Sequence, residues 1–385
     1  MPAVSRRAHH KSRAGCTTCK SKKVKCDEAT PCSYCVKRNL PCSLDPSPSP
    51  SQSQSQGSAG RGSKTPEVVP RPDEPPSFTF TDFGLYRHFT QSTAIAQADD
   101  SASVTVWREV VADLATQHSY LLHEVSAVAA LHLRSTAPPE QAAALERAAE
   151  EHQANAIPLF REALASMSAE TAPALFACSC LFIPYHFAAA KDASSLLFNK
   201  DTGALAEWLI LIQGCAAITI EHSVTLMRSS LRPLLGNLYT PKVEDLSNGP
   251  TDARLVDLTS KLPIVHEYKE CRDAYERTMI KLRVCYYISD RADTSIDRKN
   301  AALRFPPLMD AHFREDLAAQ LPAALIVMAH WCVLLHRVDA RWWLQDRVLP
   351  LMLLIEESVP LEYGSLLEWP KKEVGLHSMG EHVLR

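Results

Sequence analysis

Six cysteines near the N-terminus constrain the fold of this chain more than any other sequence feature. They are spaced Cys-x2-Cys-x6-Cys-x5-Cys-x2-Cys-x6-Cys, at Cys16, Cys19, Cys26, Cys32, Cys35 and Cys42. Two Cys-x2-Cys pairs, each followed by a third cysteine, form two similar halves. A Cys-x2-Cys loop lets two thiolates approach one tetrahedral ion at about 2.3 Å. Six thiolates are too few for two separate four-cysteine sites, but they can serve two zinc ions if two of them bridge.

The alternative interpretation of six cysteines is a disulfide knot. The N-terminal sequence MPAVSRRAHHKSR is basic and lacks the apolar core of a signal peptide. We therefore expect the protein in the cytoplasm or nucleus, where thiols stay reduced, and zinc is favoured over disulfides. A short segment with few apolar side chains could hardly fold without the metal.

Lysines crowd the interval between the second and third cysteines, at Lys20, Lys22, Lys23 and Lys25. A short helix there would project cations from a scaffold held by metal. Such cations suit phosphates and the acceptor-rich edge of guanine in the major groove. Residues 1–45 hold ten Lys/Arg and three Asp/Glu, and the rest of the chain holds 31 and 41. The alternative interpretations of these lysines are a solvated charge run or a nuclear localisation signal. A basic segment within a metal cluster instead favours double-stranded DNA as the partner.

The segment GCTTCKSKKVKCDEATPCSYCVKRNLPC, residues 15–42, resembles the zinc binuclear cluster of fungal Zn2Cys6 transcription factors. The resemblance implies that Cys16 and Cys32 bridge two zinc ions. Cys19 and Cys26 would complete one site, and Cys35 and Cys42 the other. It also implies that Lys22 and Lys23 read a CGG-like triplet, while Arg13, Lys20 and Lys25 meet phosphates. Pro31 matches the proline of the loop that joins the halves, and this loop has five residues between Cys26 and Cys32, where many members have six.

Two further segments follow the cysteine-rich domain of residues 1–45. Residues 46–76 are rich in Ser, Pro and Gln and almost free of apolar side chains, which predicts a disordered linker. Residues 77–385 contain helical periodicity and few alternating strands, which predicts a large all-α domain. No run of about 18 apolar residues occurs, so we expect no membrane span.

Apolar stripes at helical spacing locate the expected helices. One stripe runs from Trp107 to His132 and another from Leu145 to Met167. Further helices are expected near 203–220, 269–290, 314–337 and 340–357. The pairs Pro138–Pro139 and Pro306–Pro307 should punctuate these helices.

Several residues of the helical body invite a functional interpretation. His118, His132 and His152 lie on the stripes, and core histidines with hydrogen-bond partners are favoured over a metal site. Cys178 and Cys180 are expected to be free thiols in a helix rather than a redox pair. Trp331, Trp342 and Trp343 suit helix packing better than the wall of a ligand cavity. No Gly-x-Ser-x-Gly or His-Glu-x-x-His motif is present, so we expect no enzyme.

The helical body also resembles the sterol uptake control protein-like branch of the family. The resemblance rests on segments such as FTDFGLYRHFTQSTA, LLHEVSAVAALHL and AHWCVLLHR. It implies a nuclear transcription regulator whose helical domain responds to a sterol or another apolar ligand. No heptad follows Cys42, so a homodimer would form through the helical domain. The alternative is an interaction or scaffold protein that uses the zinc module as a non-specific nucleic-acid anchor.

Overall fold

The computed structural model describes residues 14–38, 40, 42–44, 80–199, 202–236, 239–247, 249–264 and 269–376. The chain divides into two units, Met1–Pro72 and Asp73–Arg385. The expected linker, 46–76, lies outside the described residues, and the division between the units falls within it. The predicted fold class is confirmed, because a small cysteine-rich unit precedes a helical unit.

The first unit contains two short helices, α1 (Thr17–Ser21) and α2 (Ser33–Lys37). Each begins directly after the first cysteine of one half of the pattern. The buried residues of this unit are almost all cysteines, with Tyr34, Leu40 and Leu44 packed at their edge. So small an apolar cluster cannot by itself offset the entropy of ordering the segment.

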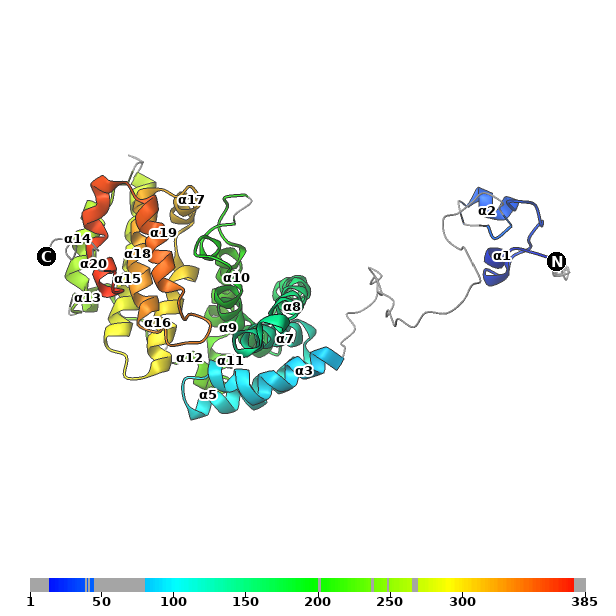
Figure 1. Ribbon diagram of the computed structural model, residues 1–385, viewed down its shortest axis with the longest axis horizontal. Coiled ribbons are helices and arrows are strands. Elements are labelled where there is room, and N and C mark those ends of the chain that lie inside the picture. The colour runs from blue at the N-terminus through cyan, green and yellow to red at the C-terminus, as the bar shows by residue number, and fades with distance from the viewer. Residues whose placement is uncertain are drawn as a thin grey trace, which may run out of the picture. The chain divides into compact units, whose positions relative to one another are not determined.

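The second unit is built from helices (Figure 1). In its described residues the strand-like pairing is a single bridge between Phe198 and Leu205. The first helices are α3 (Phe80–His88), η1 (Phe89–Thr93), α4 (Ala94–Gln97), α5 (Ser101–Thr105), η2 (Val106–Val111), α6 (Ala112–Gln117), α7 (Ser119–Thr136), α8 (Pro139–Ala165), α9 (Ala172–Ala189) and η3 (Ser194–Leu196). The chain continues through α10 (Glu207–Glu221), α11 (Ser223–Arg228), α12 (Arg232–Leu235), α13 (Val243–Leu246) and α14 (Asp252–Lys261). The last helices are α15 (Lys269–Asp290), α16 (Ser295–Leu308), α17 (Ala311–Ala318), α18 (Pro322–His336), α19 (Val348–Ser358), η4 (Leu361–Leu366) and α20 (Glu368–Glu373).

One group of helices packs around α7, which contacts α3, α6, α8 and α9. The long helix α8 begins at Pro139. Proline has no backbone N–H, but the first N–H groups of a helix have no partner within it, so no helical hydrogen bond is lost. Its buried residues Ala149, His152, Ala156 and Phe160 recur every three or four positions and face this group. Phe160 meets the ring of Phe182 edge to face, with the ring centroids 4.9 Å apart.

A second group of helices packs around α18, which contacts α15, α16, α17, α19 and α20 (Figure 1). Every residue from Ala323 to Leu335 is buried, so α18 is apolar on all sides. The indole Nε1 of Trp331 donates a hydrogen bond of 2.8 Å to the carbonyl of Ala302 on α16. The two groups of helices meet at α10, which packs against α9 of the first group and α16 of the second.

Two expected helices are interrupted in the structure. The stripe from Trp107 to His132 breaks at His118, whose extended backbone (φ −130°, ψ 106°) separates α6 from α7. The segment 314–337 breaks before Pro322, and α17 and α18 are bent by 102° relative to each other. Gln320, in the turn, has a positive φ of 55°. Apolar spacing continues through both breaks because the helices on each side bury residues in the same core.

The other expected helices agree more closely with the structure. The segment 269–290 is α15, and 203–220 corresponds to α10. The segment 340–357 is helical only from Val348 onward. Pro138 is the N-cap of α8 and Pro139 is its first residue, whereas Pro306–Pro307 occupies the last turn of α16.

One helix, α9, is long and apolar enough to cross a membrane. However, 78% of its residues lie buried inside the second unit, as in the core helix of a folded protein. A bent pair, α17 with α18, passes the same length and composition test only when taken together.

Candidate metal centre and nucleic-acid interface

The six cysteine sulfurs form two overlapping groups of four. Atoms of the first group, Cys16, Cys19, Cys26 and Cys32, all lie within 4.8 Å of one another. The second group, Cys16, Cys32, Cys35 and Cys42, meets the same limit. Cys16 and Cys32 belong to both groups, so the structure brings together the six residues that the sequence pattern singled out.

The spacing of these sulfurs fits tetrahedral zinc. With Zn–S bonds of about 2.3 Å, two sulfurs on one ion lie about 3.8 Å apart. The Sγ of Cys16 lies 3.7 Å from that of Cys32 and 3.7 Å from that of Cys35. The Sγ of Cys19 also lies 3.7 Å from that of Cys32. All six cysteines are free thiols, so the donor set suits a zinc cluster and not a disulfide knot.

Backbone amides hold the thiols in two matching arrangements. The N–H of Cys16 points to the Sγ of Cys26 at 3.4 Å, and the N–H of Cys32 points to the Sγ of Cys42 at 3.3 Å. Each of these hydrogen bonds lowers the pKa of the thiol that accepts it. Burial, in contrast, raises the pKa of Cys19, and it raises that of Cys35 to about 12. Metal binding must release the protons of these buried thiols.

Each half of the cluster also caps the helix of the other half. The carboxylate of Asp27 accepts the N–H of Ser33 at 3.2 Å, at the start of α2. Hydrogen bonds from the Ser33 side chain and, to a smaller extent, from its backbone N–H lower the pKa of Asp27. The hydroxyl of Ser43 accepts the N–H of Thr17 at 2.9 Å, at the start of α1. Asp27 and Ser43 directly follow the third cysteine of their halves, so the halves are interlocked.

The lysines do not share one helix, which corrects the sequence prediction. Only Lys20 lies within α1, because that helix ends at Ser21. Lys23 has a positive φ of 55°, and its N–H bonds to the carbonyl of Lys20 while that of Val24 bonds to the carbonyl of Cys19. These two bonds form a Schellman motif, in which glycine is the usual residue with positive φ. The motif turns the chain so that Lys22, Lys23 and Lys25 follow the helix end in a loop.

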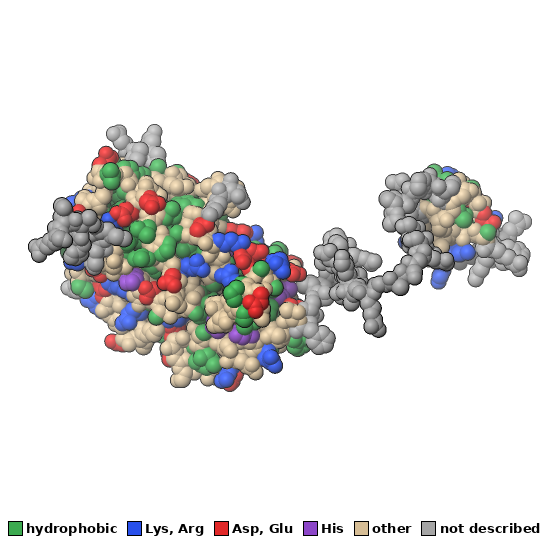
Figure 2. All heavy atoms as spheres, in the orientation of Figure 1, with side chains coloured by type: hydrophobic (Ala, Val, Ile, Leu, Met, Phe, Trp, Pro, Cys, Tyr) green, Lys and Arg blue, Asp and Glu red, His purple; other side chains and the backbone are tan. Residues whose placement is uncertain are grey.

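All four lysines are exposed, and none pairs with a carboxylate among the residues described. Lys and Arg side chains accordingly stand out on the surface of the first unit (Figure 2). Arg13 lies outside the described residues. The structure adds two exposed cations that sequence reasoning missed, Lys37 and Arg38, at the end of α2. Arg38 corresponds to Lys22 when the two halves are aligned on their cysteines, a signal already present in the sequence.

The three histidines that the sequence singled out pack within the helical unit, where His152 is buried and His118 and His132 are half-buried. His132 Nδ1 lies 3.2 Å from His88 Nε2 and 3.0 Å from Thr93 Oγ1. His152 Nδ1 lies 2.9 Å from His123 Nδ1, and its Nε2 lies 3.2 Å from Asp82. The ring of His118 packs at a tilt against that of Tyr120, with the ring centroids 5.4 Å apart. In the described part of the chain, the groups of side chains able to hold a metal consist of the six N-terminal cysteines.

The remaining candidates are also accounted for by packing. Cys178 and Cys180 lie on α9 as reduced thiols, and the Sγ of Cys178 is 4.0 Å from the carbonyl of Tyr120. Trp331 and Trp343 are fully buried core residues, and Trp342 packs on the ring of His132 at 4.8 Å between centroids. The tryptophans pack in the core as expected, and of the two thiols expected to be buried, Cys178 is buried and Cys180 is half-buried.

Two family models match the chain. Residues 14–51 match the fungal Zn(2)-Cys(6) binuclear cluster domain, which binds two zinc ions. Residues 84–239 match the fungal specific transcription factor domain. The first match covers the whole cysteine cluster, and the second runs from α3 to just beyond α12.

Similar proteins carry related names. A "Zn(2)-C6 fungal-type transcription factor" of Gibberella zeae is 28% identical over 95% of this chain and 86% of its own length. The "Zn(2)-C6 fungal-type transcription factor afumD" of Aspergillus fumigatus is 29% identical over 84% of this chain and 85% of its own. "Sterol uptake control protein 2" of Candida albicans is 55% identical over 38 residues, which are 10% of this chain and 5% of that protein. The chain is therefore similar to fungal Zn2Cys6 transcription factors in both of its units.

Proposed function

We propose that this protein is a nuclear, zinc-dependent regulator that reads CGG-like half-sites in double-stranded DNA. The observation that carries the proposal is a loop of exposed lysines anchored between two cysteines of a cluster suited to zinc. Lys22 and Lys23 follow the end of α1, and Cys26 fixes the far end of the loop. A loop held at both ends presents its cations in a defined geometry, which sequence-specific contacts require.

We assign the ligands by the overlap of the two sulfur groups. Cys16 and Cys32 would bridge the two ions, since their sulfurs belong to both groups. Cys19 and Cys26 would complete one tetrahedron, and Cys35 and Cys42 the other. The resulting cluster would hold α1 and α2 against each other in place of an apolar core.

Two roles are proposed for the cations. Lys22 and Lys23 would donate to the N7 and O6 acceptors of guanine in the major groove. Lys20, Lys25 and Arg13 would contact phosphates, which fix register without carrying sequence information. Lys37 and Arg38 extend the exposed positive surface to the second half, and we assign them to phosphates as well.

Selection of preferred duplexes from a random pool by the full chain tests this proposal. Recovery of CGG-like half-sites supports sequence-specific reading. Uniform, strongly salt-dependent binding to every duplex would instead favour the alternative of an interaction protein with a non-specific zinc anchor. Lys20→Ala is a matched control for Lys22→Ala, because both side chains are exposed and only the second is assigned to bases. The control should weaken binding to all duplexes alike, and the second variant should weaken selection.

We further propose that the helical unit regulates this activity in response to a sterol or another apolar ligand. Support comes from the similarity of this chain to a protein named for sterol uptake control. The similar segment has 38 residues and is too short to include the helical unit. A ligand that binds the folded state alone raises its melting temperature. Ergosterol should therefore raise the Tm of the full chain, and the absence of any shift would remove the sterol response. Homodimerisation through the helical unit is tested in the same samples by molecular mass in solution.

A further inference from the structure

The second half of the cysteine unit holds one cation by the same backbone geometry as the first half. The N–H of Leu40 donates to the carbonyl of Cys35 at 3.0 Å, and the N–H of Val24 donates to the carbonyl of Cys19 at 3.1 Å. The N–H of Arg38 also donates to the carbonyl of Cys35, at 3.2 Å. The backbone of Arg38 is therefore fixed at the end of α2 by two hydrogen bonds that converge on a cysteine of the cluster.

The side chain of Arg38 lies over an aromatic ring. Its guanidinium carbon is 5.5 Å from the ring centroid of Tyr34, which lies one helical turn earlier on α2. A cation within about 6 Å of a ring centroid, over the face of the ring, is attracted by the ring quadrupole. Tyr34 is itself half-buried and packs against the buried cysteines. The cluster therefore holds the ring, and the ring in turn holds the guanidinium group.

The first half has no ring at the corresponding position. When the halves are aligned on their cysteines, Thr18 corresponds to Tyr34 and Lys22 to Arg38. A lysine is a point charge on a flexible stem, whereas the planar guanidinium group can donate two parallel hydrogen bonds to one phosphate. A cation already held in one orientation also loses less side-chain freedom when it binds. The second half therefore presents a preorganised cation, and the first half presents flexible ones.

The guanidinium group of Arg38 is available to an anion. Arg38 is exposed, and it forms no ion pair with any carboxylate of the residues that the structure describes. Its neighbour Lys37 is exposed as well, so the positive charge at this end of α2 is not neutralised locally. Bidentate pairing with phosphate is the interaction for which a planar, oriented arginine is best adapted.

We propose that Tyr34 is a positioning residue for DNA binding, which holds Arg38 in the orientation that contacts a backbone phosphate of the duplex. The proposal rests on the DNA binding proposed above and deepens the assignment of Arg38 to phosphates. Tyr34 acts through the arginine and does not itself contact DNA. Phosphate contacts carry no sequence information, so the pair should contribute to affinity for every duplex and leave the preference for one sequence unchanged.

The affinity of the full chain for a selected duplex and for an unrelated duplex, measured over a range of salt concentrations, tests this role. Arg38→Ala should weaken binding to both duplexes about fivefold at about 0.15 M salt and flatten the salt dependence by about one ion. Tyr34→Ala keeps the charge but releases it, and it should weaken binding to both duplexes about two- to fivefold. Tyr34→Phe keeps the ring and should restore the affinity of the unmodified chain.

Further variants separate positioning from a structural role of the ring in the cluster. Tyr34→Leu keeps apolar packing against the cysteines without an aromatic face, so it should keep its full zinc content and bind DNA as weakly as Tyr34→Ala. The double variant of Tyr34→Ala with Arg38→Ala should bind no more weakly than Arg38→Ala alone, because the ring then has no arginine to hold. Val36→Ala is the matched control, since Val36 is an exposed residue of α2 outside the pair, and it should leave DNA affinity unchanged.

Three results would overturn the positioning role. They are an undiminished affinity in Tyr34→Ala, a Tyr34→Phe variant as weak as Tyr34→Ala, and a loss from Tyr34→Ala that persists in full when Arg38 is already alanine. Each of these leaves the proposed reading of CGG-like half-sites intact, because the preference between the two duplexes is measured in the same titrations. Absence of duplex binding by the unmodified chain would instead overturn the proposed function together with the role of Tyr34.

Discussion

Substituting Lys23 by glycine should have two opposite effects. Relief of backbone strain should stabilise the first unit, and loss of the ammonium group should weaken DNA recognition. Its positive φ of 55° places an L-residue in the left-handed region, at a cost of about 1–2 kcal/mol. Lys23→Gly removes that cost, but the freedom of glycine in the unfolded chain takes back about 0.5–1 kcal/mol. The variant should therefore stabilise the first unit by up to about 1 kcal/mol, whereas Lys23→Ala keeps the strain and should gain nothing.

The same two variants should have equal effects on sequence discrimination in DNA binding. Both remove the ammonium group, so both should lose about 1–3 kcal/mol of discrimination, which is about five- to 150-fold in relative affinity. Affinity for unrelated duplexes should fall only slightly. Lys25→Ala is the control, since it should lower affinity for every sequence and flatten the salt dependence by about one ion.

Two measurements decide the outcome. Competition between a selected duplex and one with the CGG triplet altered gives the discrimination of each variant. Titration with a zinc chelator, followed by circular dichroism, gives the relative stability of the first unit. Full discrimination in both Lys23 variants would refute the base-reading role, and a Lys23→Gly cluster less stable than Lys23→Ala would refute the backbone argument.

Three further predictions concern the metal, a buried carboxyl and the core. The full chain should hold two zinc ions by elemental analysis, with Cys16→Ser losing both and Cys42→Ser only one; equal losses would contradict the bridging assignment. Burial raises the pKa of Glu124, and neither carboxylate oxygen has a partner among the described residues, so ionisation disfavours the folded state as pH rises above the unfolded value of about 4.3. Glu124→Gln should then show a Tm advantage that grows between pH 4 and pH 8, and a constant difference would show that the charge is not the cause. Trp331→Phe should cost about 2 kcal/mol in urea unfolding, because it opens a gap and leaves the Ala302 carbonyl without its donor; a change under 0.5 kcal/mol would contradict this.

The sequence predicts the metal cluster well because ligand spacing is a local property. Cysteines with two residues between them can approach one ion, and the sulfurs of Cys16 and Cys19, like those of Cys32 and Cys35, lie within 4.8 Å of each other. The left-handed conformation of Lys23 was not predictable from residue type, since lysine rarely adopts it. It arises because the chain must leave α1 and return within a few residues to place Cys26 in the cluster.

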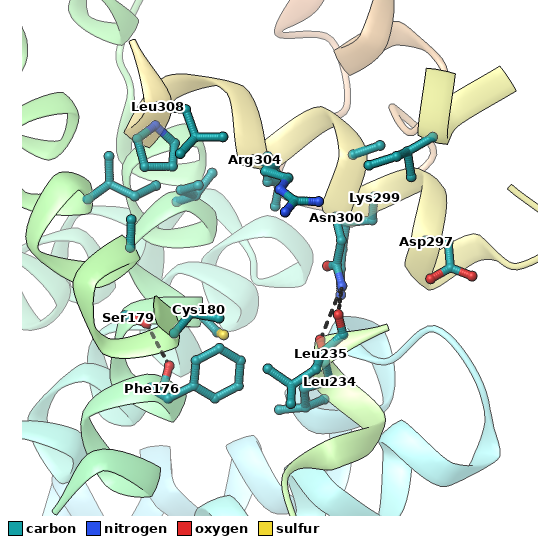
Figure 3. Close-up of a pocket in the computed structure, with 18 of the residues that line it drawn as sticks. Phe176, Ser179, Cys180, Leu234, Leu235, Asp297, Lys299, Asn300, Arg304 and Leu308 are labelled. Carbon is teal, nitrogen blue, oxygen red and sulfur yellow. Dashed lines mark hydrogen bonds between the residues drawn. The ribbon is translucent and has the colours of Figure 1, made fainter. Parts of the chain in front are cut away.

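Long-range packing accounts for what the sequence did not predict in the helical unit. The apolar patterns at 145–167 and 269–290 correctly predicted helices, because a helix that buries one face carries apolar residues every three or four positions. The cavity between α9, α10, α12 and α16 (Figure 3) could not be predicted, since these helices come from distant segments that only the packed fold brings together. Trp107 was assigned to an apolar stripe, and nothing in its neighbours in sequence indicates that its Nε1 would lack a partner among the described residues.

The central position of α18 has a consequence for how the protein is made. Synthesis from residue 80 to residue 322 takes tens of seconds at about 5–20 residues per second. In the last part of that time, after residue 269 has been added, α15, α16 and α17 form without the helix that covers their apolar faces. A nascent chain of this kind exposes apolar surface on the ribosome, and we expect it to depend on chaperones until α18 emerges. Messages that stop before codon 322 should accordingly yield aggregates, even though the zinc module at the other end of the chain was completed long before.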